Sequence, residues 1–223
     1  MNKEVVFKKN IYKLCQNEQK FINDTYFWVD LLIKTLDEID TDELLITVDR
    51  GPDIANPKII KRTNNSDTID RIKKYDIYES AFVRLYSSLE DFFIELLKLI
   101  NDYDNKLEEK NIINFCNLDL NKQLNILNDT YKLNVSNDLW YKYKNIKSIR
   151  NLIVHNNAII TDNFLVKTNY SIKCNIGQKF SFNDTFAIYI NDMKKIVGKI
   201  VYLVKVRYNL PSSQNIVDYF TER

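Results

Sequence analysis

Residues 78–100 read YESAFVRLYSSLEDFFIELLKLI, and this stretch is the strongest helical signal in the chain. Large apolar side chains recur in it every three or four residues, which is the period that covers one face of an α-helix. It contains neither Gly nor Pro, so no residue in it interrupts a helix. The stretch therefore predicts a long amphipathic helix with one face in a hydrophobic core.

The rest of the composition favours the same kind of fold. The chain has 223 residues, of which only 3 are Gly and 3 are Pro. An all-β protein needs many more turn residues, so we expect helices to dominate. With 45% apolar and 28% charged residues the chain has an ordinary globular composition, and it is long enough to bury a core without disulfides or metals. We predict a mainly α fold built as a helical bundle.

Helical spacing extends over most of the chain on both sides of the quoted stretch. Residues 40–65 interrupt it, because they hold Gly51 and two prolines, and predict a loop. One long bent helix or two helices are expected over 3–40. A helix over 66–103 follows, with a cap at Ser66 or Asp67 and a break near Tyr75, and then a shorter helix over 118–131. The last two are a helix over 137–156 capped by Ser136 and a closing helix capped by Asn183 or Asp184 and ended by Pro211.

Between the last two expected helices the pattern changes its period. Residues 158–160, 164–168, 171–175 and 179–182 alternate or carry β-branched side chains, with polar turn residues between them. This pattern predicts a small β-hairpin or meander before the last helix. The predicted organisation begins with helices and a Pro/Gly loop over 1–65, packed on or beside the core. A helical domain over 66–210 and a C-terminal tail over 211–223 follow.

Charge and cysteine usage exclude several classes of protein. The net charge of +2 is the difference between 32 basic and 30 acidic residues, which excludes a strongly basic protein that coats nucleic acid. The three cysteines are far apart and form no CxxC pair, so neither a zinc ribbon nor a disulfide framework is expected. The N-terminus has no signal-peptide core, and no apolar run is long enough for a bilayer. We expect a cytoplasmic protein without a membrane segment.

The single histidine, His155, excludes every mechanism that needs two histidines within one chain. These include HExxH zinc sites and multi-histidine metal cages. The three scattered glycines form no phosphate loop, no GxGxxG and no nucleophile elbow. We therefore expect neither a metal nor a cofactor, and a histidine-dependent catalyst would have to use His155.

The segment around His155 reads IRNLIVH over residues 149–155 and places Arg150 five positions before the histidine. At about 100° per residue, Arg150 lies at the edge of the apolar arc of the predicted helix, roughly 140° from His155. The opposite polar face carries Lys144, Ser148, Asn151 and His155. Two plainer interpretations stay open: His155 as a surface histidine without a task, and Arg150 as an arginine whose head reaches water past an apolar stem.

Glu90 is the second misplaced charge, because it lies inside the apolar arc of the helix over residues 78–100. A carboxylate in such a place is costly unless it is paired. One helix with a misplaced acid and another with a misplaced arginine predict a Glu90–Arg150 pair, with Asp91 as the alternative acid. The plainer interpretation is that Glu90 reaches solvent at the edge of its helix.

The helix around Glu90, followed some fifty residues later by IRNLIVHNNAII, resembles the HEPN superfamily (higher eukaryotes and prokaryotes nucleotide-binding domains). The similarity is strongest to stand-alone prokaryotic members from phage-defence and toxin systems, and it covers about residues 67–209. The family's R-x4-6-H motif corresponds to Arg150 and His155, with Asn151 at the usual polar position. Glu90 best matches the family's helix-borne acid, with Asp91 next.

The resemblance implies an enzyme, a metal-independent endoribonuclease that acts as a homodimer with its two motifs facing each other. The 2′-hydroxyl of RNA attacks the adjacent phosphate, His155 takes or gives the proton, and Arg150 stabilises the phosphate charge. An antitoxin or another defence-system protein is an implied partner. Further RNA contacts are expected from five polar side chains, which are Lys144, Lys147, Ser148, Arg84 and Asn156. The alternative is a non-catalytic HEPN module that binds a nucleotide or a protein partner.

Overall fold

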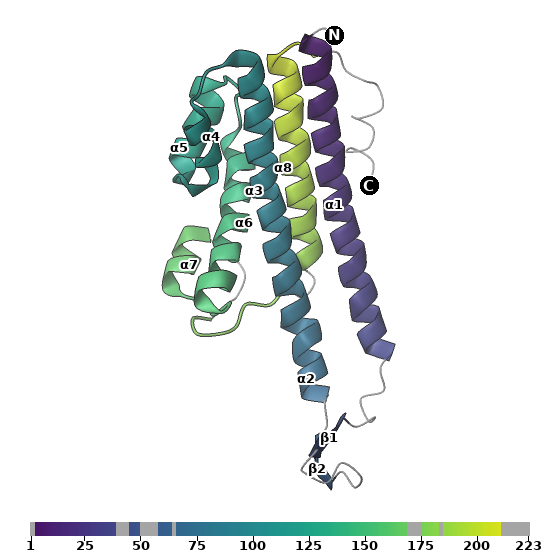
Figure 1. The fold of residues 1–223 in the computed structure, drawn as a ribbon. Helices are drawn as coiled ribbons and strands as arrows, with labels where there is room; N and C mark the ends of the chain where they lie inside the picture. The colour runs from purple at the N-terminus through teal and green to yellow at the C-terminus, as the bar shows by residue number, and fades with distance from the viewer. Residues whose placement is uncertain are drawn as a thin grey trace.

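The computed structural model describes residues 3–38, 45–49, 58–63, 66–168, 175–182 and 185–210. Four long helices lie side by side along the molecule (Figure 1). They are α1 (Lys3–Glu38), α3 (Ile77–Asp104), α6 (Asn137–Asn156) and α8 (Phe186–Arg207). The predicted mainly α bundle is therefore confirmed.

Helix α3 is the centre of the bundle and contains the stretch with the strongest helical signal. It packs against α1, α6 and α8. Its core-facing side chains follow the predicted spacing; the buried ones are Phe82, Leu85, Tyr86, Leu89, Phe92, Phe93, Leu96, Leu97 and Ile100. The expected change near Tyr75 is a π-helical turn, η1 (Ile72–Asp76), which joins the short α2 (Ser66–Arg71) to α3. The Ser66 and Asp67 side chains lie outside the described ones.

Helix α1 is one continuous helix over Lys3–Glu38 and shares the core with α3 and α8. Its Glu18 is buried, with only 7% of its surface exposed, and accepts a hydrogen bond of 2.7 Å from the Ser88 hydroxyl of α3. Burial raises the pKa of Glu18, and the Ser88 hydrogen bond partly opposes that rise. Buried apolar contacts and this polar contact thus join the N-terminal helix directly to the central one.

The helices between α3 and α6 are short. They are α4 (Glu109–Ile113), the 3-10 turn η2 (Phe115–Asn117), α5 (Leu120–Asn125) and the π-helical turn η3 (Ile126–Thr130). Asp119 caps α5 by accepting from the Lys122 backbone N–H. Ser136 caps α6 as predicted, because its hydroxyl accepts from the Leu139 backbone N–H. At α8, Thr185 precedes the first helical residue, whereas Asn183, Asp184 and Pro211 lie outside the described residues.

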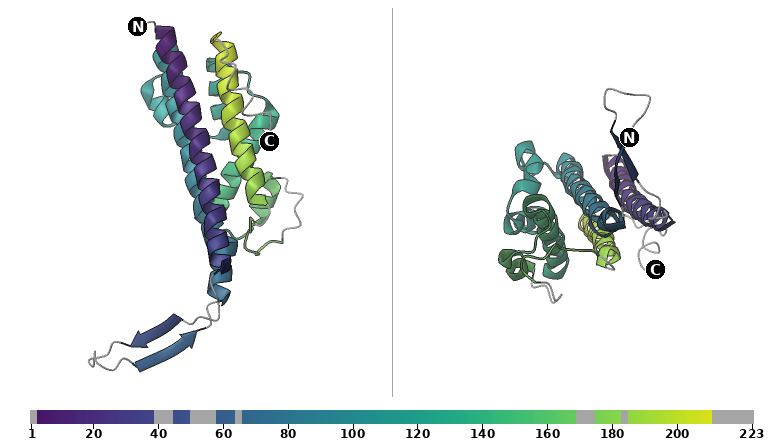
Figure 2. Two further views of the ribbon diagram at one scale, coloured as in Figure 1. Left: turned by 90° about the vertical axis from the view of Figure 1, so that its right-hand side faces the viewer. Right: turned by 90° about the horizontal axis from the view of Figure 1, so that it is seen from below.

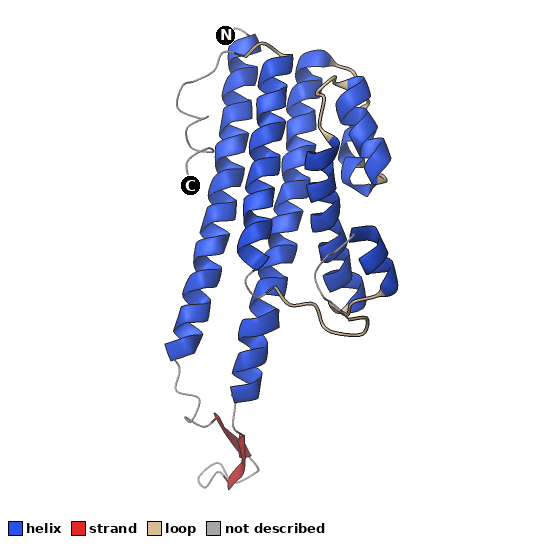
Figure 3. Ribbon diagram, turned by 180° about the vertical axis from the view of Figure 1, so that it is seen from behind, coloured by secondary structure: helices blue, strands red, loops and turns tan. Residues whose placement is uncertain are grey.

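The β structure differs from the prediction. An antiparallel hairpin of β1 (Leu45–Asp49) and β2 (Lys58–Thr63) lies in the segment predicted to be a loop (Figure 2). The segment predicted as a hairpin before α8 instead contains a helix, α7 (Asp162–Thr168), and an isolated bridge between Ile159 and Lys179. Residues 171–174 of that predicted meander are outside the described part of the chain. Figure 3 shows the helices of the bundle with the β1–β2 hairpin beyond their ends.

The prediction at 164–168 was wrong because five residues are too few to separate a strand from a helical turn by period alone. The Thr161 hydroxyl accepts from the backbone N–H of Phe164 at 3.2 Å, which satisfies a donor at the start of a helix. Phe164 then packs into the core, while Val166 is 75% exposed. Among the described residues, no helix combines the length and the apolar run needed to cross a lipid bilayer.

Candidate functional site

The end of α6 positions the three residues of the predicted motif. Arg150 lies on the side of α6 that faces α3, and His155 lies in the last turn and is exposed. Asn157 ends the helix in the left-handed conformation, with a φ of 49°, and Ala158 donates its backbone N–H to the Leu152 carbonyl at 3.0 Å. This closure fixes the last turn, so the backbone that carries His155 has a defined direction.

Arg150 brings the motif together. Its Nη1 donates to the Asn151 Oδ1 at 2.9 Å and lies 3.5 Å from the His155 Nε2. A guanidinium has only donors, so a hydrogen bond in the second contact would use the Nε2 lone pair as its acceptor. The contact with His155 is long and therefore weak. One cluster thus contains Arg150, its sequence neighbour Asn151 and the more distant His155.

The guanidinium of Arg150 lies over the ring of Tyr86, a residue of α3. The Arg150 Cζ lies 5.7 Å from the centre of this ring, within the range of a cation–π contact. Tyr86 is 1% exposed, so its ring is a fixed platform. The Arg150 Nε is buried and makes no hydrogen bond with another described residue. The cation–π contact with Tyr86 and the bond to Asn151 therefore set the direction in which the remaining Arg150 donors point.

The expected direct pair between Glu90 and Arg150 is wrong. The Glu90 carboxylate accepts its hydrogen bond, 2.8 Å long, from the Tyr86 hydroxyl, whereas the Arg150 hydrogen bonds go to Asn151 and His155. Tyr86 is four residues before Glu90 on the same helix, a spacing that places the two side chains next to each other, so the Tyr86 hydroxyl takes the place expected for Arg150. Glu90 and Arg150 are nevertheless linked, because both contact Tyr86.

Tyr143 and Lys147, both from α6, complete this polar cluster between α3 and α6. The hydroxyl oxygens of Tyr143 and Tyr86 are 3.5 Å apart, and burial raises the pKa of both tyrosines. Lys147 donates to the Cys116 backbone carbonyl at 3.0 Å. Burial lowers the pKa of Lys147, while the nearby Glu90 charge opposes that change. Burial also raises the pKa of Cys116 to about 12, which makes this thiol a poor nucleophile.

The other residues predicted to contact RNA are distributed unevenly. Lys144 and Ser148 are partly buried on the face of α6 that carries Asn151 and His155, and Asn156 is exposed beside His155. Arg84 is not brought to this site. Its guanidinium lies over the ring of Phe21 of α1 at 5.5 Å, on the other side of α3. Asp91, the alternative acid, is exposed and lines a hollow between α1 and α3 with Glu18 and Ser88.

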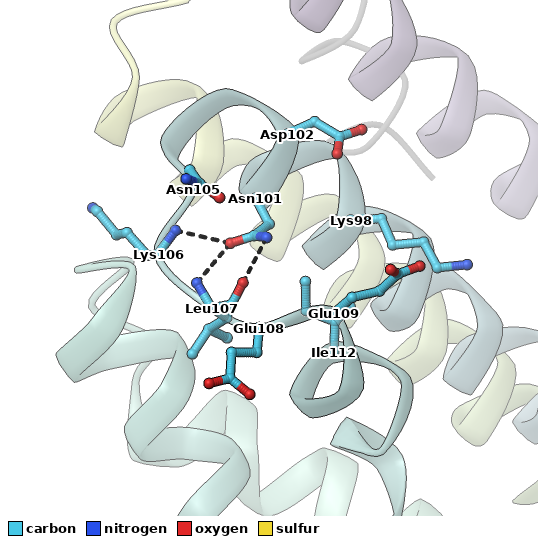
Figure 4. Close-up of a pocket in the computed structure, with 9 residues that line it drawn as sticks. All are labelled: Lys98, Asn101, Asp102, Asn105, Lys106, Leu107, Glu108, Glu109 and Ile112. Carbon is cyan, nitrogen blue, oxygen red and sulfur yellow. Dashed lines mark hydrogen bonds between the residues drawn. The ribbon is translucent and has the colours of Figure 1, made fainter.

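A polar hollow of about 750 Å³ lies elsewhere, at the turn between α3 and α4 (Figure 4). Asn101 organises it: its Oδ1 accepts from the backbone N–H groups of Lys106 and Leu107, and its Nδ2 donates to the Leu107 carbonyl. These bonds close the chain after α3, so the hollow is a consequence of a turn. In the described part of the chain, no group of three or more His, Cys, Asp or Glu side chains could hold a metal ion.

Tyr86 and Tyr143 are the site residues that the sequence analysis missed. Both lie in the apolar arcs of their helices, where spacing alone predicts ordinary core residues. A signal was present, because a buried tyrosine hydroxyl needs a hydrogen-bond partner. Two such residues on the helices that carry Glu90 and Arg150 would have indicated a shared polar cluster.

Comparison of the chain with models of protein families, with curated proteins and with solved structures finds no match. The site is therefore interpreted from its own geometry. It is a surface cluster at the end of one bundle helix, in which an oriented guanidinium lies beside an imidazole that can accept a proton.

We expect Tyr86→Phe to lower the free energy of unfolding by about 1–3 kcal/mol, because the Glu90 carboxylate loses its donor while remaining partly buried. The Phe ring still lies beneath Arg150, so the guanidinium keeps part of its support. Urea unfolding followed by circular dichroism measures the change. Tyr202→Phe is the matched control, since Tyr202 is 47% exposed on α8, and should change stability by less than about 0.5 kcal/mol. Equal midpoints for Tyr86→Phe and the wild type would contradict the role given to this hydroxyl.

Proposed function

We propose that this chain is a metal-independent endoribonuclease of the HEPN type, in which Arg150, Asn151 and His155 cleave RNA. The observation that carries the proposal is the contact of the Arg150 Nη1 with both the Asn151 Oδ1 and the His155 Nε2. A fixed cationic donor beside a proton acceptor fits a phosphate oxygen and the adjacent 2′-hydroxyl, because the two groups are carried by neighbouring carbon atoms of the ribose in RNA.

In the proposed reaction, the long contact between the Arg150 Nη1 and the His155 Nε2 gives way to the substrate. The His155 Nε2 then takes the proton of the 2′-hydroxyl as its oxygen bonds to phosphorus. The bond from phosphorus to the 5′-oxygen breaks, and that oxygen needs a proton from a second acid. His155 of a second copy supplies it, so one histidine per chain gives two per site. Arg150 stabilises the charge on the phosphate oxygens, and Asn151 holds Arg150.

The proposed assembly is a homodimer in which the α6 face of Lys144, Ser148, Asn151 and His155 lies at or beside the two-fold axis. His155 is exposed in the single chain, which leaves it open to such a partner. We propose that the enzyme is a toxin or antiviral-defence effector of the cytoplasm, with an antitoxin or another defence protein as its regulator. Lys147 and Asn156 stay proposed RNA contacts, whereas Arg84 is no longer proposed because it lies over Phe21 of α1.

The second candidate is a non-catalytic module that binds a nucleotide or a protein partner through the same cluster. The exposed position of His155 at the end of α6 also suits it, because a partner molecule could reach the imidazole directly. The purified full chain, incubated with single-stranded RNA in excess EDTA, separates the two candidates. The ribonuclease proposal predicts fragments, whereas the binding module predicts that the RNA stays intact.

A further inference from the structure

Helix α1 carries a stripe of six exposed side chains on the side away from the core: Lys20, Asp24, Phe27, Leu31, Lys34 and Glu38. They are spaced alternately four and three residues apart, so they fall within an arc of about 80° at about 100° per residue. The buried residues of α1, such as Ile22 and Val29, lie roughly opposite. We call these six residues the outer stripe of α1.

The centre of the outer stripe is apolar although it is exposed. Phe27 is 59% exposed and Leu31 is 38% exposed, and Trp28 and Leu32 beside them are 58% and 48% exposed. Single exposed apolar side chains are ordinary, but four large ones within six residues of one helix indicate a binding surface.

The order of the stripe is complementary to itself. When a second α1 runs antiparallel with position 29 opposite position 29, Phe27 faces Leu31. In the same register Asp24 faces Lys34, and Lys20 faces Glu38. Two-fold symmetry repeats each pair, so an apolar centre is flanked on both sides by two pairs of opposite charge.

We propose that the outer stripe of α1 binds the same stripe of a second copy of this chain, as an antiparallel helix pair about a two-fold axis. This inference goes beyond the proposed ribonuclease activity and does not depend on it. The two α1 helices would pack at a small angle, as in a two-stranded coiled coil.

Other arrangements of two copies fit the stripe less well. A parallel pair in register places each charge against the same charge. An antiparallel pair shifted by seven residues places Phe27 opposite Glu38 or Asp24, so charges face apolar side chains. Lys34 already pairs with Asp30 of its own helix at 2.7 Å, but both residues are exposed, and such a pair is weak enough for Lys34 to be shared.

This interface is separate from the end of α6. Helices α3 and α8 lie between α1 and α6 (Figure 2). The α1 pair therefore cannot be the contact that brings two His155 side chains together, and a chain that used both contacts would form assemblies larger than a dimer. The overlapping part of α1, from Lys20 to Glu38, is about 28 Å long. Because this is a modest contact, we expect the dissociation constant of the pair to lie in the micromolar range.

The first test measures the mass of the full chain by sedimentation equilibrium over a micromolar concentration series. We expect the double substitution Phe27→Ser with Leu31→Ser to halve the mass of the assembly and to leave the circular dichroism spectrum of the folded chain unchanged, because both side chains are exposed in the single chain. Val5→Ser is the matched control, since Val5 is 56% exposed on the same helix outside the overlap, and should keep the wild-type mass. A wild type that sediments as a single chain at every concentration would overturn the proposal. The same holds if that single chain binds lipid vesicles or another protein through the outer stripe.

The second test fixes the register. Asp24→Lys alone and Lys34→Asp alone each create two like-charged pairs, so each should weaken self-association at least tenfold. Mixing the two variants restores both opposite-charge pairs in a heterodimer, which should associate about as tightly as the wild type. Lys13→Asp, on the same face but beyond the overlap, should have no effect. A mixture that associates no more tightly than either variant would refute the antiparallel register.

Discussion

His155→Ala is expected to reduce RNA cleavage by about 100- to 10,000-fold, which is the usual contribution of a positioned general base or acid. His155 is the only histidine of the chain, so no other imidazole can replace it. If the second histidine of each site comes from a second copy, the substitution removes the base and the acid together, and the loss should be at the upper end of this range.

The fold should not change in His155→Ala, because the side chain is exposed and its contact with Arg150 is long. Val154→Ala is the matched control: Val154 is 45% exposed in the same helical turn and should retain cleavage. Initial rates on a labelled single-stranded RNA, with circular dichroism spectra of each variant, give the comparison. Cleavage that persists undiminished in His155→Ala would mean that another site, or a contaminant, cuts the RNA.

Arg150→Lys is expected to reduce cleavage by about 100- to 1,000-fold, although it keeps the positive charge. A lysine cannot reproduce the planar fork that lies over the Tyr86 ring and donates to Asn151. The phosphate would then meet a mobile point charge, and stabilisation of the transition state would be lost rather than binding in general. The rate constant at saturating RNA should therefore fall much more than the affinity for RNA.

Fluorescence anisotropy for RNA binding and single-turnover rates separate these two effects for Arg150→Lys. Arg71→Lys is the control for exchanging an arginine, because Arg71 lies exposed in α2 and pairs with Asp76. It should leave both quantities unchanged. A fall in RNA affinity that accounts for all of the lost cleavage would assign Arg150 a binding role only.

The long helices could be predicted because burial on one face imposes a period that is visible over many turns. The pattern over residues 78–100 belongs to α3, and the Ser136 cap marks the start of α6. The short elements could not be predicted in the same way. Helix α7 and the β1–β2 hairpin are each made of segments of five to seven residues, in which helical and strand periods fit equally well.

The candidate site shows a similar division. Helix geometry indicated that the Glu90 carboxylate is costly unless paired, and it named Arg150 on another helix as the partner, which was wrong. It could not identify Tyr86 as that partner, because a helical wheel gives the direction of a side chain but not the position of its terminal hydroxyl. The link from Glu90 through Tyr86 to Arg150 depends on the 2.8 Å and 5.7 Å contacts of a single ring, which only the folded structure defines.

The most direct test of the proposed ribonuclease is the chemistry of the product ends. The purified full chain is incubated in excess EDTA with a defined RNA, and the fragments are identified by mass spectrometry. Attack by the 2′-hydroxyl predicts 2′,3′-cyclic phosphate or 3′-phosphate ends, and no cleavage at a position where the RNA carries a 2′-deoxy sugar. Fragments with 3′-hydroxyl ends, or cleavage only after a divalent metal is added, would contradict the proposed mechanism.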